Sequence, residues 1–407
     1  MRALVIIIIF AITAFSLLLK YLDYSKRDSP IPENVRDVFD EEGYKKRRAY
    51  SMENLRFSLV GEAFDLIVIL AILLLNVHHA LYEYIYSFTS NIYLTSLFVL
   101  MVPILVMTVL DCFFAIYQTF VIEARYGFNK TTPKTFAIDC IKELLISIVV
   151  IAGIFSLFLF LYAQLGNWVF LAFFFVLILL QIVVTFISPL LIRIMNKLTP
   201  IEDGELKDKI EALASETGYK LKGIYMVDAS KRSTKLNAFA AGFGKTKTIG
   251  LFDTLVEKMT ADEIVAILAH EIGHAKKQHI IKSVPFSLLT FSILLGVAFF
   301  ALTTPYLSHA FGFADINIAF SVFALIFLVS PLFVLLAIPS NAISRKNEYE
   351  ADRYAKEWSG KEVFISALKK IYREDLGNLT PHPFVVMIGY SHPPLSQRVA
   401  ALEKDEG

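Results

Sequence analysis

Long apolar runs alternate with polar stretches along this chain of 407 residues. The runs cover roughly residues 3–19, 64–84, 95–120, 144–165, 168–192, 284–307 and 316–338. Each has about the 20 residues that a helix needs to cross the hydrocarbon of a bilayer. The first run is followed by Lys20 and further charges instead of a small-residue cleavage site, so we interpret it as a retained span. The pattern predicts seven transmembrane helices, with the two termini on opposite sides of the membrane.

Basic residues indicate how these spans are oriented. The connections after the first, third and fifth runs are rich in Lys and Arg, whereas those after the second, fourth and sixth runs contain none. Loops that carry Lys and Arg remain on the cytoplasmic side. We therefore expect the basic connections and the C-terminus in the cytoplasm, and the N-terminus outside.

Two polar segments are long enough to build a cytoplasmic domain together. We divide the chain into residues 1–195 with five spans, 196–282 with a soluble segment, 283–340 with two further spans, and 341–407 with a second soluble segment. An amphipathic helix is expected at Glu205–Thr217, stopped by Gly218. Short strands are expected at Tyr225–Val227, Asn237–Gly244 and Thr248–Phe252. The predicted fold class is an all-α polytopic membrane protein that carries a cytoplasmic α+β domain.

Composition agrees with a membrane protein and excludes two other classes. Apolar residues make up 56% of the chain and charged residues only 19%, whereas soluble globular chains carry about 25% charged residues. The net charge is +1 and no basic patch with interleaved aromatic residues is present, so nucleic-acid binding is not expected. Cys112 and Cys140 form no C-x-x-C pair, which excludes a cysteine-ligated metal site.

The strongest chemical signal lies on a helix in the first soluble segment. Thr260 and Glu263 fit a capping box, which predicts that a helix begins there. Further along come His270, Glu271 and His274. Because four residues are just over one helical turn, both imidazoles project from one face and can hold one metal ion. Glu271 then lies beside the metal, where a carboxylate can take a proton from bound water.

A catalytic zinc needs a third protein ligand. The best candidate segment is residues 341–352, which contains Glu348, Glu350 and Asp352. Glu348 and Asp352 are four residues apart and share a helix face, so one can bind the metal while the other accepts the N–H of a histidine ligand. Spacing alone does not distinguish Glu348 from Glu350.

Motifs that run in one order over most of the chain carry a family resemblance. They are Glu123–Thr132, Glu205–Leu213, Asp228–Ser233, Asn237–Gly244, His270–His274, Ser344–Arg345 with Glu348 and Asp352, and Ser391–Leu395 with Arg398. In this order they resemble the type I CAAX prenyl proteases, polytopic zinc endopeptidases that cut C-terminal to a prenylated cysteine. The resemblance implies seven helices around a large water-filled intramembrane chamber, with a zincin-like metalloprotease domain at its cytoplasmic end.

The resemblance also assigns roles to single residues. It makes Glu348 the third ligand of one zinc ion per chain, beside His270 and His274, and Glu271 the general base. Asp352 and Arg398 would support the ligands, and His392 would stabilise the oxyanion. The strand would bind substrate by strand addition, through Asn237, Ala238, Phe239, Ala240 and Gly242.

We therefore expect a membrane zinc endopeptidase that hydrolyses bonds near the C-terminus of lipidated or membrane-associated peptides. A quality-control metalloprotease without a lipid requirement is the nearest alternative. A transporter or receptor with an incidental histidine motif, and a catalytically dead scaffold, belong to other classes. The short loop at residues 308–315 and the end of the chain soon after Arg398 favour a prokaryotic relative. The expected location is then the inner cell membrane, or the endoplasmic reticulum membrane for a eukaryotic chain. The oligomeric state stays open.

Overall fold

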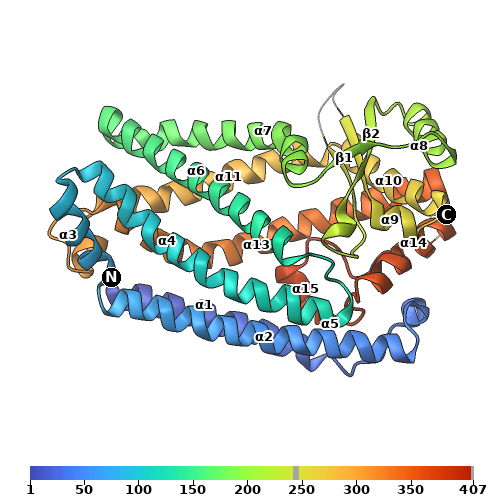
Figure 1. The fold of residues 1–407 in the computed structure, drawn as a ribbon, viewed down its shortest axis with the longest axis horizontal. Helices are drawn as coiled ribbons and strands as arrows, with labels where there is room; N and C mark the ends of the chain where they lie inside the picture. Colours follow the sequence, from blue (N-terminus) through green and yellow to red (C-terminus); the bar gives the residue numbers. More distant parts are fainter. Residues whose placement is uncertain (242–246, 405–407) are drawn as a thin grey trace.

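The computed structural model describes residues 1–241 and 247–404, with the backbone alone for residues 185–195 and 241. Long helices lie side by side along the longest axis of the molecule (Figure 1). The sheet gathers with helices α8, α9, α10 and α14 at the end of the molecule where the C-terminus lies, and α3 lies at the opposite end. The sheet and its helices therefore cap one end of a helical bundle.

The bundle is built from apolar helices that agree with most of the predicted spans. They are α1 (Arg2–Ser25), α2 (Glu41–Leu74), α3 (Val77–Thr89), α4 (Ile92–Tyr117), α6 (Pro133–Leu165), α7 (Val169–Met195), α11 (His279–Thr303) and α13 (Ile318–Ser359). A π-helical segment η2 (Gln118–Glu123) and α5 (Ala124–Tyr126) continue α4, and a short α12 (Tyr306–Ala310) follows α11. Six segments of the described chain are long and apolar enough to cross a membrane. One of them, Pro133–Val184, contains α6 and the first part of α7. The turn η3 (Gly166–Trp168) separates these two helices, which pack against each other.

The second span differs from the prediction. The apolar run at residues 64–84 is not one helix, because α2 ends at Leu74 and α3 begins at Val77. Asn76 between them adopts a left-handed conformation with φ 53°, which asparagine tolerates better than most residues. The apolar run is therefore divided between the end of α2 and the separate helix α3.

The sheet has four strands in the order β1-β2-β4-β3. They are β1 (Leu198–Pro200), β2 (Leu221–Val227), β3 (Ala238–Ala241) and β4 (Lys247–Phe252). β2 and β4 pair in parallel, whereas β1 pairs antiparallel with β2 and β3 pairs antiparallel with β4. β3 is therefore an edge strand, as its predicted role requires, and Gly242 of the predicted substrate strand lies outside the described residues.

Helices around the sheet bury one continuous apolar core. They are η1 (Glu33–Val38), α8 (Glu205–Glu216), α9 (Asp253–Lys258), α10 (Ala261–Lys276), α14 (Lys361–Glu374) and α16 (Leu395–Glu403). Two short helices, η4 (Ala229–Lys231) and α15 (Pro383–Gly389), lie outside this core. Ile249 and Leu251 of β4 are fully buried against Ile264, Leu268 and Ile272 of α10. Burying each such side chain stabilises the fold by about 1.5–3 kcal/mol. This core fixes the helix that carries the predicted histidine motif.

Helix α13 joins the bundle to the part of the molecule that contains the sheet. α13 starts in the predicted seventh span and continues without interruption to Ser359. The boundary predicted between residues 340 and 341 is therefore not a break in the structure. The predicted seventh span and the residues around Glu348 therefore lie on one continuous helix.

Candidate active site

Helix α10 starts as the sequence predicts and holds two imidazoles together. The Thr260 hydroxyl accepts a hydrogen bond from the backbone N–H of Glu263, and the Glu263 carboxylate accepts one from that of Thr260. One face of the helix is buried in the core, and on it the Nε2 atoms of His270 and His274 lie 3.1 Å apart. The capping box and the core therefore fix the rotation of this helix and the direction of both rings.

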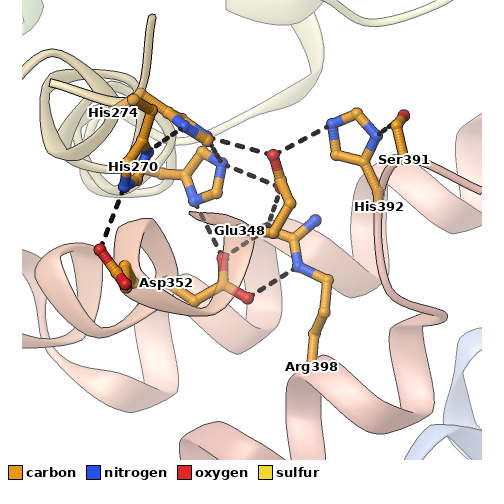
Figure 2. Close-up of polar contacts among 9 residues, drawn as sticks. His270, His274, Glu348, Asp352, Ser391, His392 and Arg398 are labelled. Atoms are coloured by element: carbon orange, nitrogen blue, oxygen red, sulfur yellow. Dashed lines mark hydrogen bonds and ion pairs between the residues drawn. The ribbon is translucent and has the colours of Figure 1, made fainter. Parts of the chain in front are cut away.

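Helix α13 supplies the third group (Figure 2). The Glu348 carboxylate lies with Oε1 3.2 Å from His274 Nε2 and Oε2 3.4 Å from His270 Nε2. This close approach depends on Gly273, because a Cβ atom there would lie 3.0 Å from Tyr354 Cβ and 3.2 Å from Ala351 Cα. Packing of the two helices at Gly273 thus brings the carboxylate to the imidazoles.

The group fits a zinc ion. One ligand atom each from His270, His274 and Glu348 lie within 4.8 Å of one another. Two neutral imidazoles and a carboxylate are a common donor set of catalytic zinc, with a further position left for water. Glu348 Oε2 is buried and has no hydrogen-bond partner within the described chain. A bound cation would give this oxygen a partner. Burial alone would raise the pKa of Glu348, but the two imidazoles beside its carboxylate outweigh burial and hold that pKa well below its usual range.

Asp352 and Arg398 support this group from behind. Asp352 Oδ1 lies 2.9 Å from His270 Nδ1, the ring nitrogen that points away from Glu348. Arg398 donates to both carboxylate oxygens of Asp352, from Nε at 2.8 Å and from Nη2 at 2.5 Å. Both residues are buried. Burial opposes the charge of Asp352, yet the Arg398 guanidinium keeps the pKa of Asp352 lowered.

His274 has a matching partner that the sequence analysis missed. Its Nδ1 atom lies 2.8 Å from Nδ1 of His279, and His279 Nε2 lies 3.3 Å from Oε2 of Glu350. His279 is buried, and the Lys282 ammonium lies 3.4 Å from the same Glu350 oxygen. A histidine five residues after His274 was the available signal. Glu350, one of the two open ligand candidates, therefore lies behind His274 and not among the ligand atoms.

Glu271 and His392 lie on the accessible side of the group. Glu271 is partly exposed and makes no hydrogen bond or ion pair with any described residue. His392 has a side chain 62% exposed, with Nε2 3.4 Å from Glu348 Oε1 and Nδ1 2.9 Å from the Ser391 hydroxyl. Figure 2 shows His392 across Glu348 from the two imidazoles. Both groups can therefore meet a substrate without crossing the buried ligands.

The predicted substrate strand lies beside the zinc helix. β3 pairs with β4 through Ala238 to Ala241 and packs near α10. Asn237, just before it, accepts a hydrogen bond from the Phe252 backbone N–H. The Phe239 ring covers Gly250, where a Cβ atom would lie only 2.1 Å from the ring. β3 therefore lies beside the helix that carries His270 and His274, and its outer edge can pair with another strand.

A His-His-Glu group at the end of a bundle of long apolar helices defines the chain as a membrane zinc metallopeptidase. Family models agree with this class. Residues 20–197 match the CAAX prenyl protease N-terminal model with five membrane helices, and residues 200–406 match peptidase family M48. The chain belongs to the M48 peptidases, in the CAAX prenyl protease 1 (Ste24) family.

Relatives share almost the whole chain. CAAX prenyl protease 1 of Saccharomyces cerevisiae is 34% identical over 97% of this chain and 94% of its own length. The human homologue is 28% identical over 93% of this chain and 90% of its own. The crystal structure of Ste24p from S. mikatae superposes with a TM-score of 0.93, at 30% identity, over 99% of both chains. The fold and its membrane and protease parts are therefore those of this family.

Proposed function

We propose that this protein cleaves peptide bonds close to the C-terminus of prenylated, membrane-associated peptides. One observation carries the proposal: His270, His274 and Glu348 converge on one point while buried groups hold the two imidazoles from behind. The CAAX prenyl proteases that resemble the chain over more than nine-tenths of its length support the substrate class.

In this proposal His270, His274 and Glu348 would hold a single zinc ion. Zinc, when bound, polarises the scissile carbonyl and makes water more acidic. Glu271, which no described residue engages, accepts a proton from the attacking water and returns it to the leaving amine. The absence of a hydrogen bond or ion pair between Glu271 and any described residue supports this role.

His392 and β3 orient the substrate. An N–H of His392 donates to the carbonyl oxygen as negative charge grows on it, which lowers the barrier by electrostatic stabilisation. The edge of β3, with Asn237, Ala238, Phe239 and Ala240, pairs with the peptide backbone. Backbone pairing tolerates many side chains, so the specificity comes from other parts of the site.

Groups behind the ligands keep them in place. Asp352, held by Arg398, orients His270, and His279, held by Glu350, orients His274. Such partners fix the tautomer and direction of a ligand imidazole. We assign these four residues positioning roles and not contacts with substrate.

The membrane part is proposed to contain seven spans, with α6 and α7 crossing separately, around a water-filled chamber. Polar groups within the bundle support this arrangement, because charge that faces lipid is costly. Glu62 of α2 lies 2.9 Å from the Lys20 ammonium of α1, and Gln181 of α7 donates to Ser287 of α11 at 3.3 Å. The basic connections lie at the protease end, which supports a cytoplasmic active site.

Product analysis tests the function. The full chain in detergent or nanodiscs is incubated with one peptide in farnesylated and plain forms, and the products are identified by mass spectrometry. We expect cleavage near the C-terminus of the farnesylated peptide, lost after chelation and restored by zinc. Equal cleavage of the plain peptide would favour the quality-control alternative, and no cleavage of any peptide by zinc-loaded protein contradicts the enzyme.

A further inference from the structure

A cavity of about 690 Å³ lies outside the ligand group, where the ends of α1 and α2 meet residues 378–390. It begins just beyond the first apolar run, so in the proposed topology it lies at the cytoplasmic surface of the bilayer. Leu19, Leu55, Phe57 and Val385 give part of its lining an apolar character. The rest of the lining is polar and strongly basic.

Positive charge exceeds negative charge in this lining. The basic side chains are Lys20, Lys26, Arg27, Arg47 and Arg48, and the acidic one is Asp23. The Asp23 carboxylate already accepts hydrogen bonds from Asn378 Nδ2 and from the His382 backbone N–H, both at 3.2 Å. Asp28 forms ion pairs with both Arg27 and Arg48. Within the described residues, no carboxylate lies within ion-pair distance of Lys26 or Arg47.

Arg47 is the most informative of these residues. It is only 4% exposed, and its Nη2 donates to Asn378 Oδ1 at 2.5 Å. Its Nε is buried without a hydrogen-bond partner in the described chain. Burying a guanidinium is costly, and the Asp23 carboxylate and the Tyr44 hydroxyl near Arg47 offset part of that cost. An anion in the cavity, which Arg47 lines, would stabilise its charge further.

We propose that this cavity binds the phosphate of an anionic phospholipid of the cytoplasmic leaflet. Basic pockets between membrane helices on this side are suited to anionic lipid head groups, and the apolar lining suits the start of the acyl chains. The general preference for basic residues in cytoplasmic loops accounts for exposed charges. It does not account for a guanidinium that is only 4% exposed and lines a cavity.

Occupancy also bears on the active site. Asn378, which contacts Arg47, and Tyr390, which lines the cavity, belong to the segment that leads to His392. The Tyr390 carbonyl accepts a hydrogen bond of 2.7 Å from Arg345 on α13, one turn before Glu348. The bound phosphate therefore steadies the segment that precedes His392. The lipid site itself does not depend on proteolysis, so it is tested by binding.

Native mass spectrometry of the full chain tests the site. The protein is released from detergent after addition of phosphatidylglycerol or phosphatidylcholine with identical acyl chains, and a third sample receives inorganic phosphate. The cavity variant K26Q/R48Q is compared with R36Q/K45Q, which removes the same charge from the neighbouring exposed positions Arg36 and Lys45. Both variants spare the buried Arg47, so folding is retained.

We expect wild type to retain phosphatidylglycerol in preference to phosphatidylcholine. The cavity variant should lose about tenfold in affinity for phosphatidylglycerol, and the exposed-pair variant less than twofold. Equal retention of the two lipids, or an equal loss in both variants, overturns the proposal. Displacement of phosphatidylglycerol by inorganic phosphate at low millimolar concentration overturns the lipid assignment in favour of a free anion.

Discussion

The Nδ1 atoms of His274 and His279 lie 2.8 Å apart. A neutral imidazole that offers Nε2 to a metal carries its proton on Nδ1. His274 then donates to His279, and His279 carries its own proton on Nε2 toward Glu350, 3.3 Å away. The result is a carboxylate–imidazole–imidazole chain that ends at a proposed zinc ligand, beside the shorter Asp352–His270 pair.

Replacing His279 should weaken zinc binding. His279→Phe keeps a buried ring but removes the acceptor for His274, and loss of such a partner typically weakens metal affinity by about 10–100-fold. His279→Asn can place its amide oxygen near the former Nδ1 and should recover part of the affinity. Competition with a chromophoric chelator measures the change, and the visible spectrum of cobalt-substituted protein reports the ligand geometry.

Glu350→Gln supplies the second arm of this test, with the exposed Glu357→Gln on the same helix as its control. We expect a loss of zinc affinity in the first variant and none in the second. Unchanged affinity in a folded His279→Phe protein contradicts the positioning role. Failure of wild type to bind zinc contradicts the proposed site instead, so the two failures are distinguishable.

Glu271→Gln should separate zinc binding from catalysis. The amide cannot accept a proton, whereas the three ligand groups are untouched, so zinc content should remain near one per chain. Losing the base should raise the activation free energy by several kcal/mol. Since each 1.36 kcal/mol changes the rate tenfold, cleavage should fall by at least about a thousandfold. Single-turnover cleavage of a farnesylated peptide, with zinc measured on the same sample, checks both. Near wild-type cleavage contradicts the role of base.

The sequence predicted the features that depend only on residues close together in the chain. Thr260 and Glu263 satisfy each other within one helical turn, and the two histidines of the motif share a face by spacing alone, so these predictions were confirmed. Gly218 follows the helix that it was predicted to stop, with φ 60°. Each of these features is set by backbone geometry over fewer than six residues.

Features that depend on the packing of distant segments could not be predicted from the sequence. Glu348 and Glu350 are equivalent by spacing, and only the approach of α13 to α10 at Gly273 brings Glu348 to the imidazoles. His279 reaches His274 because Gln278 adopts a left-handed conformation, with φ 56°, between α10 and α11. The left-handed turn at Asn76 divided the predicted second span for a similar reason. Neither Gln278 nor Asn76 is a glycine, the residue that usually marks such a turn in a sequence.

Adding a methyl group at Gly250 should disturb the substrate strand. The Cβ of Gly250→Ala would lie 2.1 Å from the Phe239 ring, so that ring, and the edge of β3 with it, has to move. We expect a loss of about 1–3 kcal/mol of stability and a rise in KM, measured by thermal unfolding and by peptide cleavage.

A second substitution provides the control for this prediction. In Gly250→Ala/Phe239→Leu the smaller side chain leaves room for the new methyl group, so stability should recover relative to Gly250→Ala alone. Additive losses in the double variant would show that the two positions do not interact and contradict the packing argument.

Asp375 should make stability fall as pH rises from about 4 to 6. Burial raises its pKa from the ordinary 3.8 to about 6, against the Leu236 backbone N–H and the Lys235 charge, which lower it. The folded state therefore holds a proton that the unfolded state has lost. The stabilisation is complete below pH 3.8 and disappears as pH rises through the folded value. The full difference corresponds to about 3 kcal/mol, reduced to about 1–2 kcal/mol by partial exposure.

Asp375→Asn tests this assignment. It should flatten the fall in stability with pH and raise the Tm at pH 7.5, whereas Asp315→Asn at an exposed position should do neither. A pH profile of Tm for Asp375→Asn that coincides with wild type contradicts the assignment.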